Sequence, residues 1–362
     1  MGMVPTPVGY FAASVPLKLA SGERRVDSCI VVTSSHNPPD YNGFKMVRRG
    51  AANYGEQILA LHQRIVDQNF ADSSGSYTEY DILEDVIRAL KETDAETGFA
   101  FDGDGDRLGV VTKDGHSIYP DRQLMLFAEE VLSRNKGAQI IYDVKCTRNL
   151  AKWVKDKGGE PLMWKTGHSL VKAKLRETGA PLAGEMSGDV FFKDRWYGFD
   201  DGLYTGARLL EILTRVADPS KLPNSHSTPE LQVKLEEGEN FELIARLQQN
   251  AKFTGADNVV KIDGLRVEYP DGFGLARSSN TTPVVVMRFE ADNDAALKRI
   301  QYDFRRVILA EKADAKPPFR RLMRRRASKF VKTARSAAAT ERGAGCPTAP
   351  RFSCLLYVTH AR

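Results

Sequence analysis

The sequence predicts an α/β fold with mixed sheets, followed by a small C-terminal α+β domain. Helical and strand-like segments alternate along most of the chain, which is typical of layered α/β proteins. Of the 362 residues, 42% are hydrophobic and 27% are charged, which is enough for more than one core. A Pro/Ser-rich hinge at 219–229 then leads into a segment rich in strands.

The order of the elements supports this fold class. An apolar run at 29–32 predicts a strand, 55–68 an amphipathic helix and 71–80 a Ser/Gly-rich linker. Further helices are expected at 82–93, 121–134, 147–157, 169–178 and 200–216, and strands at 98–101, 108–112, 139–143, 161–164 and 181–185. The strand-rich part spans 228–292 and has helices at 241–250 and 293–309.

Charge is distributed unevenly between the body and the C-terminus. Residues 320–362 hold eleven Lys/Arg and one acid, Glu341, which gives this segment a net charge of +10. Because the whole chain has a formal net charge of +5, residues 1–319 carry −5. The segment is rich in Ala and Ser and has no apolar periodicity, so we expect a disordered, appended tail. Nonspecific binding of nucleic acid through this tail is the alternative, and no specific nucleic-acid partner is expected.

Composition also bounds the compartment. Cys29, Cys146, Cys346 and Cys354 lack metal-ligand spacing, which suits thiols in a reducing cytoplasm. No apolar run approaches the ~18 residues that a membrane-spanning helix needs, and the N-terminus lacks the features of a signal peptide. We therefore expect a cytoplasmic protein without a membrane partner.

The sharpest chemical signal is the run Asp102-Gly103-Asp104-Gly105-Asp106-Arg107. Three carboxylates at alternate positions converge on one hard cation if the intervening glycines take positive φ and let the backbone curl. An EF-hand is excluded because its sixth and twelfth positions hold Arg107 and Lys113 in place of Gly and Glu. A polar turn between two strands is the structural alternative.

A second loop presents Ser35 after the expected strand 29–32, closed by Pro38 and Pro39. The carboxyl end of a strand is where α/β folds place ligands, and a phosphoryl group on Ser35 would add oxygens to a magnesium site. A Ser/Asn/Pro-rich turn without chemistry is the alternative for this loop alone.

These loops resemble the α-D-phosphohexomutases, and the resemblance is strongest to the bacterial phosphomannomutase/phosphoglucomutase branch over nearly all of residues 1–319. Four runs carry it in the family's order: 33–45 resembles the phosphoserine loop, 102–107 the metal loop, 184–188 the sugar-recognition loop and 277–283 the phosphate-binding loop. The resemblance implies mutase-type domains around a central cleft. The expected domains are an incomplete phosphoserine domain at 1–80, a remnant of the metal-binding domain at 81–116, a sugar-recognition domain at 117–227, a phosphate-binding domain at 228–319 and the tail at 320–362.

The resemblance also implies roles for individual residues. The catalytic group is expected to be Ser35, Lys45 and Arg107, and one Mg²⁺ is expected on Ser35, Asp102, Asp104 and Asp106. Substrate is expected to bind Lys145, His168, Glu185, Ser187, Asp189, Arg277, Ser278, Ser279, Asn280 and Thr281. A carboxylate such as Glu185 bridges two sugar hydroxyls. The guanidinium of Arg277, with the hydroxyl and amide donors that follow it, suits a phosphate dianion, and Gly272 and Gly274 favour close approach of a ligand. A buried, satisfied Glu185 and a surface turn at 277–283 are the alternatives.

The implied activity interconverts hexose 1-phosphate and hexose 6-phosphate through a phosphoserine at Ser35 and a hexose 1,6-bisphosphate, which is also the primer. The substrates would be glucose and mannose 1- and 6-phosphates, with no preference evident from the sequence, and the protein would be a monomer. A catalytically impaired remnant that only binds sugar phosphate is the alternative.

Three features depart from the family pattern. The family's first domain begins before the counterpart of Met1, so we expect early strands and an active-site arginine to be missing. Ser35 and Asp102 are only 67 positions apart, too few for a whole second domain, which predicts an internal deletion before Leu83. Asp189 stands where the family usually has a histidine, which changes the local charge and proton-transfer pKa.

Overall fold

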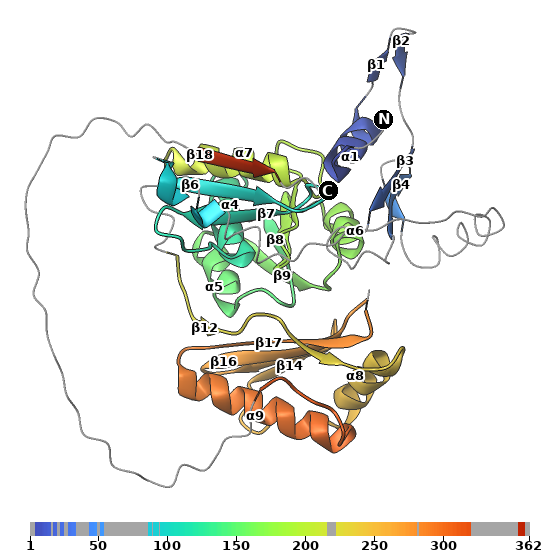
Figure 1. The fold of residues 1–362 in the computed structure, drawn as a ribbon, viewed down its shortest axis with the longest axis vertical. Helices are drawn as coiled ribbons and strands as arrows, with labels where there is room; N and C mark the ends of the chain where they lie inside the picture. The colour runs from blue at the N-terminus through green and yellow to red at the C-terminus, as the bar shows by residue number, and fades with distance from the viewer. Residues whose placement is uncertain are drawn as a thin grey trace, which may run out of the picture.

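The computed structural model describes residues 4–15, 17–19, 22–24, 28–33, 43–48, 51–53, 86–88, 90–93, 95–215, 222–280, 282–319 and 354–358. Ser35, Thr281, the expected helix at 55–68 and the linker at 71–80 lie outside the described residues. Within them, the mixed α/β fold class is confirmed, with several sheets covered by helices (Figure 1). Among the described helices, none combines the length and the apolarity that crossing a membrane requires.

The N-terminal part contains a short helix and two small sheets. Its elements are α1 (Thr6–Ser14), β1 (Leu17–Leu19), β2 (Gly22–Arg24), β3 (Ser28–Thr33), β4 (Gly43–Arg48) and β5 (Ala51–Asn53). Strands β3, β4 and β5 form an antiparallel sheet, and α1 packs against β3 and β4. This packing brings Lys45 on β4 and Thr6 on α1 to the same side of the molecule.

A hairpin of β6 (Thr97–Phe101) and β7 (Leu108–Thr112) flanks the aspartate loop. The other edge of β6 pairs in parallel with β18 (Cys354–Val358), which lies beside it in Figure 1. The expectation of disorder throughout 320–362 is therefore wrong for residues 354–358. An apolar pentapeptide satisfies its backbone groups on a strand edge, and neither composition nor charge reveals that partner.

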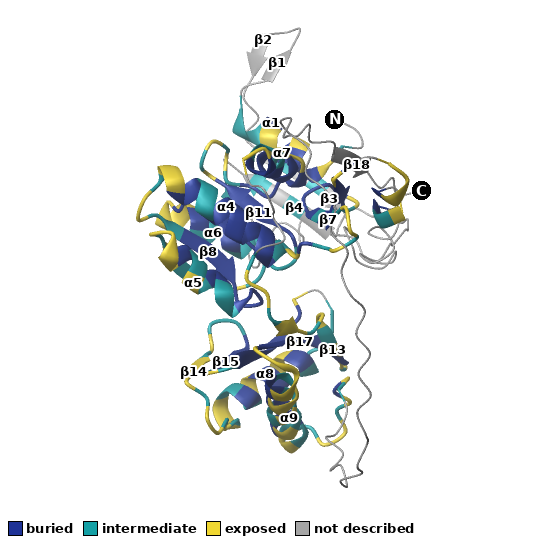
Figure 2. Ribbon diagram, turned by 90° about the vertical axis from the view of Figure 1, so that its left-hand side faces the viewer, coloured by how far each residue is buried: buried dark blue, intermediate teal, exposed yellow. Residues whose placement is uncertain are grey.

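The central unit is a four-stranded sheet with helices on its faces. Its elements are α4 (Pro120–Arg134), β8 (Gln139–Asp143), α5 (Arg148–Asp156), β9 (Glu160–Trp164), α6 (His168–Thr178), β10 (Leu182–Gly184), β11 (Val190–Phe192) and α7 (Gly202–Leu213). The strand order is β11-β10-β8-β9, with β11 antiparallel to β10 and the other pairs parallel. Apolar side chains from α4, α5 and α7 fill the main core, and β8 and β11 are buried between layers (Figure 2).

The C-terminal unit is an antiparallel sheet with two helices on one face (Figure 1). Its elements are β12 (His226–Ser227), β13 (Leu231–Lys234), α8 (Glu239–Asn250), β14 (Asn258–Val260), β15 (Leu265–Tyr269), β16 (Gly272–Ser278), β17 (Val284–Ala291) and α9 (Asp294–Glu311). Side chains alternate between the faces: Val267 and Phe289 enter the core beneath α8 and α9, whereas Arg266 and Arg288 face the central unit.

The two glycines of β16 serve this packing. A Cβ on Gly272 would lie 2.3 Å from the carbonyl oxygen of Glu290, and one on Gly274 would lie 2.4 Å from the Phe304 ring. Their expected role in close approach of a ligand is therefore wrong, because each lets a strand approach its neighbours in the core.

Buried polar groups join the two units. Arg266 Nη1 donates to the carbonyl oxygens of Val144 (2.6 Å) and Cys146 (2.7 Å). Arg288 contacts Asp121 at 3.2 Å, and Thr147 Oγ1 donates to Glu290 at 2.8 Å. The loop after β8 is thus fixed against the sheet that carries Arg277.

Candidate active site

The aspartate loop 102–106 brings its three carboxylates together. One oxygen each from Asp102, Asp104 and Asp106 lies within 4.8 Å of the others, and Asp104 and Asp106 are buried. The turn depends on Gly105, whose φ is +73°, and its N–H donates to the carbonyl of Asp102 at 3.1 Å. Gly103 does not take positive φ. The sequence predicted positive φ at both glycines, but Gly105 alone is enough to turn the loop.

Two residues from the N-terminal part reach this loop. Lys45 Nζ lies 2.9 Å from Asp104 Oδ2 and also forms an ion pair with Asp106. Thr6 donates to Asp104 Oδ2 through its hydroxyl at 2.8 Å. Burial lowers the pKa of Lys45, but Asp106 and the other carboxylates around it outweigh that effect and raise the pKa, so the amine is charged.

Arg107 holds the opposite side of the loop. Its Nε and Nη2 both lie 2.8 Å from Asp102 Oδ2, and its backbone N–H donates to Asp102 Oδ1 at 3.2 Å. The guanidinium Nε also approaches Asp106 Oδ1 at 3.8 Å. Lys45 and Arg107 thus place two positive charges against the three aspartates, as charge stabilisers would.

The loop at 184–189 meets the aspartate loop through Asp189. Asp189 forms a backbone bridge with Arg107, and one of its carboxylate oxygens lies within 4.8 Å of those of Asp106 and Asp200. Ser187 donates to Asp189 at 2.7 Å. Burial raises the pKa of the Asp189 carboxyl, while Arg107 and Lys45 oppose the rise.

Glu185 is only 3% exposed, and it accepts a hydrogen bond from the backbone N–H of Gly167. Burial raises its pKa well above the usual value, with Asp189 and Asp143 adding to the rise. In this conformation Glu185 is a buried, hydrogen-bonded carboxylate, which was the alternative to a sugar-binding role.

Sequence reasoning missed Asp200. This carboxylate is fully buried, and Lys172 Nζ contacts its Oδ1 at 2.7 Å, while His168 Nδ1 lies 3.7 Å from its Oδ2. Burial raises its pKa, but Lys172 and His168 outweigh this and lower it to about 2. Burial and Lys172 lower the pKa of His168 to about 3, so the imidazole is neutral at pH 7. The signal available was the acidic doublet before helix α7, whose second member, Asp201, caps that helix by accepting from Tyr204 N–H.

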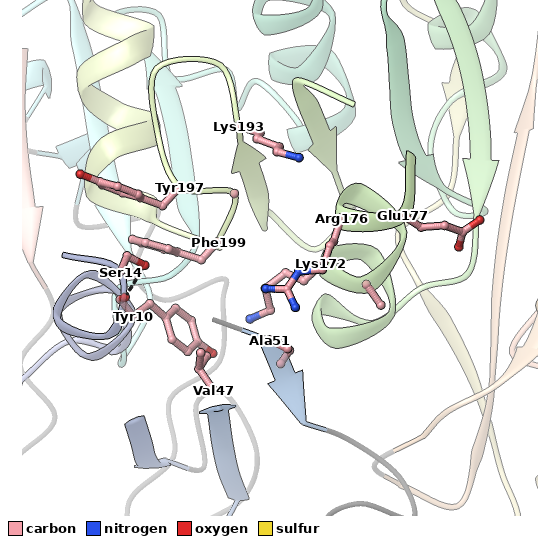
Figure 3. A pocket seen from close by; sticks show the side chains of 13 residues that line it. Tyr10, Ser14, Val47, Ala51, Lys172, Arg176, Glu177, Lys193, Tyr197 and Phe199 are labelled. Atoms are coloured by element: carbon pink, nitrogen blue, oxygen red, sulfur yellow. Dashed lines mark hydrogen bonds between the residues drawn. The ribbon is translucent and has the colours of Figure 1, made fainter. Parts of the chain in front are cut away.

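Lys172 also lines a pocket of about 520 Å³ (Figure 3). Arg176 and Lys193 add positive charge to this pocket, and Tyr10 and Phe199 add aromatic surface. The Lys172 ammonium lies 4.2 Å from the centroid of the Tyr10 ring. Lys172 therefore joins the N-terminal helix, the pocket wall and Asp200.

A second polar group surrounds Arg277. Its Nε contacts Asp263 Oδ2 at 2.9 Å, and the same carboxylate oxygen accepts from Thr166 N–H at 2.9 Å. Lys145 pairs with Glu230 at 2.7 Å and follows β8 where the sequence placed it at the strand's end. Asp143 joins the loops by accepting from Thr166 Oγ1 at 2.8 Å. Glu230 and Asp263 gave no motif in the sequence, because each pairs with a residue distant along the chain.

The rest of the 277–283 loop is partly described. Ser278 and Ser279 are buried: Ser278 donates to the carbonyl of Asn240 at 2.9 Å, and Ser279 accepts from Thr282 Oγ1 at 3.1 Å. Asn280 is exposed. The described residues at the aspartate loop and those at Arg277 thus form two groups. The segment 185–189 lies between them, and in it Glu185 N–H donates to the Asp189 carbonyl at 2.8 Å.

Comparison with known proteins decides the family. Residues 1–72, 119–228 and 230–307 match domain I, domain III and the C-terminal domain of phosphoglucomutase/phosphomannomutase. A phosphoglucomutase of Neisseria gonorrhoeae is 47% identical over 386 residues, which cover 85% of this chain and 81% of the relative. The chain belongs to the α-D-phosphohexomutase family. A phosphomannomutase/phosphoglucomutase of Pseudomonas aeruginosa is 44% identical, covering 88% of this chain and 82% of the relative.

Solved structures agree with this membership. A phosphoglucomutase/phosphomannomutase family protein from Burkholderia thailandensis has 65% sequence identity and a TM-score of 0.79, over 88% of this chain and 83% of that one. A putative phosphomannomutase of Thermus thermophilus shares the fold at 17% identity, with a TM-score of 0.62. The predicted family and its bacterial branch are confirmed, and the function is that of a phosphohexomutase, an isomerase that transfers a phosphoryl group within a sugar phosphate. The roles of the individual site residues stay predictions.

Proposed function

We propose that this phosphohexomutase interconverts the 1- and 6-phosphates of glucose and mannose with Ser35 as the phosphoryl carrier and one Mg²⁺ on Asp102, Asp104 and Asp106. The observation that carries the proposal is the convergence of three carboxylates within 4.8 Å beside Lys45 and Arg107. We also assign the enzyme to the cytoplasm, as its cysteine usage favours, and treat it as a monomer.

The chemistry of the donors fits a hard divalent cation. The Oδ1 atom of Asp106 is buried and, among the described residues, has no hydrogen-bond partner. Burial raises the pKa of Asp106 well above its usual value, a cost that a bound cation would relieve. When bound, Mg²⁺ would supply charge neutralisation for the transferring phosphoryl group.

Charge around the loop is consistent with a single ion. The acids are Asp102, Asp104, Asp106, Asp189 and Asp200, and the cations against them are Lys45, Arg107 and Lys172. With every group ionised, this described cluster carries two more negative than positive charges, which one divalent cation balances.

In the proposed reaction, the bond between phosphorus and Ser35 Oγ breaks as a sugar hydroxyl oxygen bonds to the phosphorus, giving the hexose 1,6-bisphosphate. The bisphosphate reorients, and its other phosphoryl group returns to Ser35. Lys45 and Arg107 stabilise charge on the transferring oxygens. Because Lys45 is already protonated, Asp189, with its raised pKa, is the better candidate to receive the hydroxyl proton.

Substrate contacts are assigned to the two ends of the site. Glu185 and Ser187 would bind sugar hydroxyls, and Lys145 and His168 would lie beside them. The 277–281 loop would hold the phosphate that is not reacting. Both Lys145 and Arg277 are now paired with carboxylates, so substrate would have to replace the contacts with Glu230 and Asp263.

The Asp189 substitution favours a second candidate, a chain that binds sugar phosphates without turnover. A carboxylate beside a phosphate repels it, whereas the family's histidine does not. Binding through Glu185 and Arg277 would survive this change, but transfer would not.

Turnover of glucose 1-phosphate and mannose 1-phosphate separates the two candidates. The assay contains Mg²⁺ and a trace of glucose 1,6-bisphosphate, with Ser35→Ala as the inactive control and Ser34→Ala as the matched one. We expect turnover that is lost only in Ser35→Ala. Binding of glucose 6-phosphate without turnover, by soluble and folded protein, would establish the non-catalytic candidate.

A further inference from the structure

The C-terminal strand β18 pairs with β6 along its whole length. The parallel register runs from Cys354 opposite Thr97 to Val358 opposite Phe101. Within the described residues, β6 is the middle strand of a three-stranded sheet, with β7 on its other side (Figure 1). The pairing partner therefore comes from the far end of the chain, outside the three ranges that match the family's domains.

The register places β18 directly at the aspartate loop. Its last pair ends at Phe101, which immediately precedes Asp102, and β7 begins at Leu108 after Arg107. The loop thus leaves the sheet at the position where β6 has partners on both sides. Any change in the pairing of β6 is transmitted to the backbone of Asp102 without an intervening residue.

The environment of β6 requires such a partner. All five of its residues are buried, and Phe99 and Phe101 belong to the main core. Without β18, the edge of β6 that faces away from β7 would present a row of unpaired N–H and C=O groups, which favours pairing with another chain.

We infer that the C-terminal segment is a working part of the enzyme: residues 354–358 complete the β6 sheet and hold the strand that positions the aspartate loop. The occupant of this edge is the chain's own terminus, because residues 320–353 are long enough to join α9 to β18 in one molecule. The effect on metal binding rests on the proposed function, whereas the effect on β6 does not.

Hydrogen exchange of the full-length protein tests the strand. N–H groups alternate in direction along a strand, so one of Leu355 and Leu356 donates toward β6, and a Leu355→Pro/Leu356→Pro variant removes that donor whichever it is. We expect amides of 97–101 to lose protection by at least tenfold, while amides of 139–143 on β8 keep theirs. Arg342→Pro is the matched control outside β18 and should match the wild type.

Mn²⁺ affinity of the same three proteins, measured by electron paramagnetic resonance, tests the link to the loop. We expect several-fold weaker binding only in the double-proline variant. Lost protection at 97–101 with no Mn²⁺ bound by any of the proteins would uphold the strand and overturn the metal assignment. Unchanged protection at 97–101 would overturn the inference itself.

A synthetic peptide of residues 351–361 extends the test to a chain that ends at residue 349. The peptide should restore protection at 97–101, and a scrambled peptide should not. Restoration by both peptides would contradict the register. Light scattering of the full-length protein shows whether β18 comes from the same molecule or from a second copy. A dimer whose amides at 97–101 lose protection on dilution would mean that β18 pairs with β6 of a second copy, which would overturn pairing within one chain.

Discussion

At the scale of single residues, the site is organised by charges that the fold places far from water. Asp104 shares its Oδ2 with Thr6 and Lys45, so one carboxylate gathers the N-terminal helix and the β4 strand onto the loop. Asp200 similarly gathers Lys172 and His168. Neither cluster would be inferred from spacing, since Thr6 and Lys45 are distant from Asp104 along the chain, and the partners of Asp200 lie on helix α6, well before it.

Replacing Asp104 by Asn should weaken Mn²⁺ binding by roughly tenfold or more, because removing a direct ligand costs at least as much as removing an outer-shell group. Isothermal titration with Mn²⁺ measures this. Asp114→Asn, in the exposed turn beside His116, is the control and should bind normally. Equal affinity in both variants would exclude Asp104 as a ligand.

Replacing Lys172 by Met should reduce the free energy of unfolding by about 3 kcal/mol, because it leaves the buried Asp200 charge without its strongest partner. Lys152→Met is the control, since the exposed pair with Asp156 contributes about 0.5 kcal/mol or less. Denaturant unfolding compares them. A difference below about 1 kcal/mol between the two variants would show that Asp200 does not need Lys172.

At the scale of elements, helix α7 is seated on the aspartate loop. The N–H of Gly202 donates to the carbonyl of Gly105 at 3.2 Å, and a Cβ on Gly202 would lie 2.8 Å from the carbonyl oxygen of Arg107. The first residue of this helix must therefore be glycine for the loop and helix to approach this closely.

Gly202→Ala should lower the free energy of unfolding by about 1–3 kcal/mol, because the new methyl group forces the loop away from the helix. Mn²⁺ affinity should fall with it. Leu203→Ala, at an exposed neighbouring position, provides the comparison and should change neither quantity appreciably. Thermal unfolding with and without Mn²⁺ gives both results, and wild-type behaviour of Gly202→Ala would contradict the close approach.

Elements with local signals were predicted well from the sequence. The helices expected at 121–134 and 147–157 appear as α4 and α5 within one residue at each end, because apolar spacing and capping residues such as Thr147 are local. The strand at 354–358 was missed because its stability comes from pairing with residues 97–101, far away in the sequence. The aspartate loop was found because its three acids lie at alternate positions within one short run. The role of Asp200 was missed because its partners are brought to it by tertiary packing.

At the scale of the whole molecule, buried polar contacts fix the C-terminal sheet to the central unit. Arg288 is 2% exposed and binds both Asp121 on α4 and the backbone carbonyl of Lys145. The loop that carries Lys145 is therefore held by the C-terminal sheet through Arg288.

Arg288→Met should reduce the free energy of unfolding by about 3–5 kcal/mol, since Asp121 would keep a buried charge without that partner. The exposed Arg299, which pairs with Asp271 at 2.6 Å, supplies the control Arg299→Met, with an expected loss of about 1 kcal/mol or less. Chemical unfolding measures both. Equal, small losses would mean that the junction does not depend on Arg288.

Whether Ser35 carries the phosphoryl group is the most direct question. Mass mapping of the protein after incubation with glucose 1,6-bisphosphate and Mg²⁺ answers it, with Ser34→Ala and Ser35→Ala treated in parallel. We predict one phosphoryl group on Ser35, removed again by glucose 6-phosphate and absent only from Ser35→Ala. A phosphoryl group on another residue, or turnover that persists in Ser35→Ala, would contradict the account.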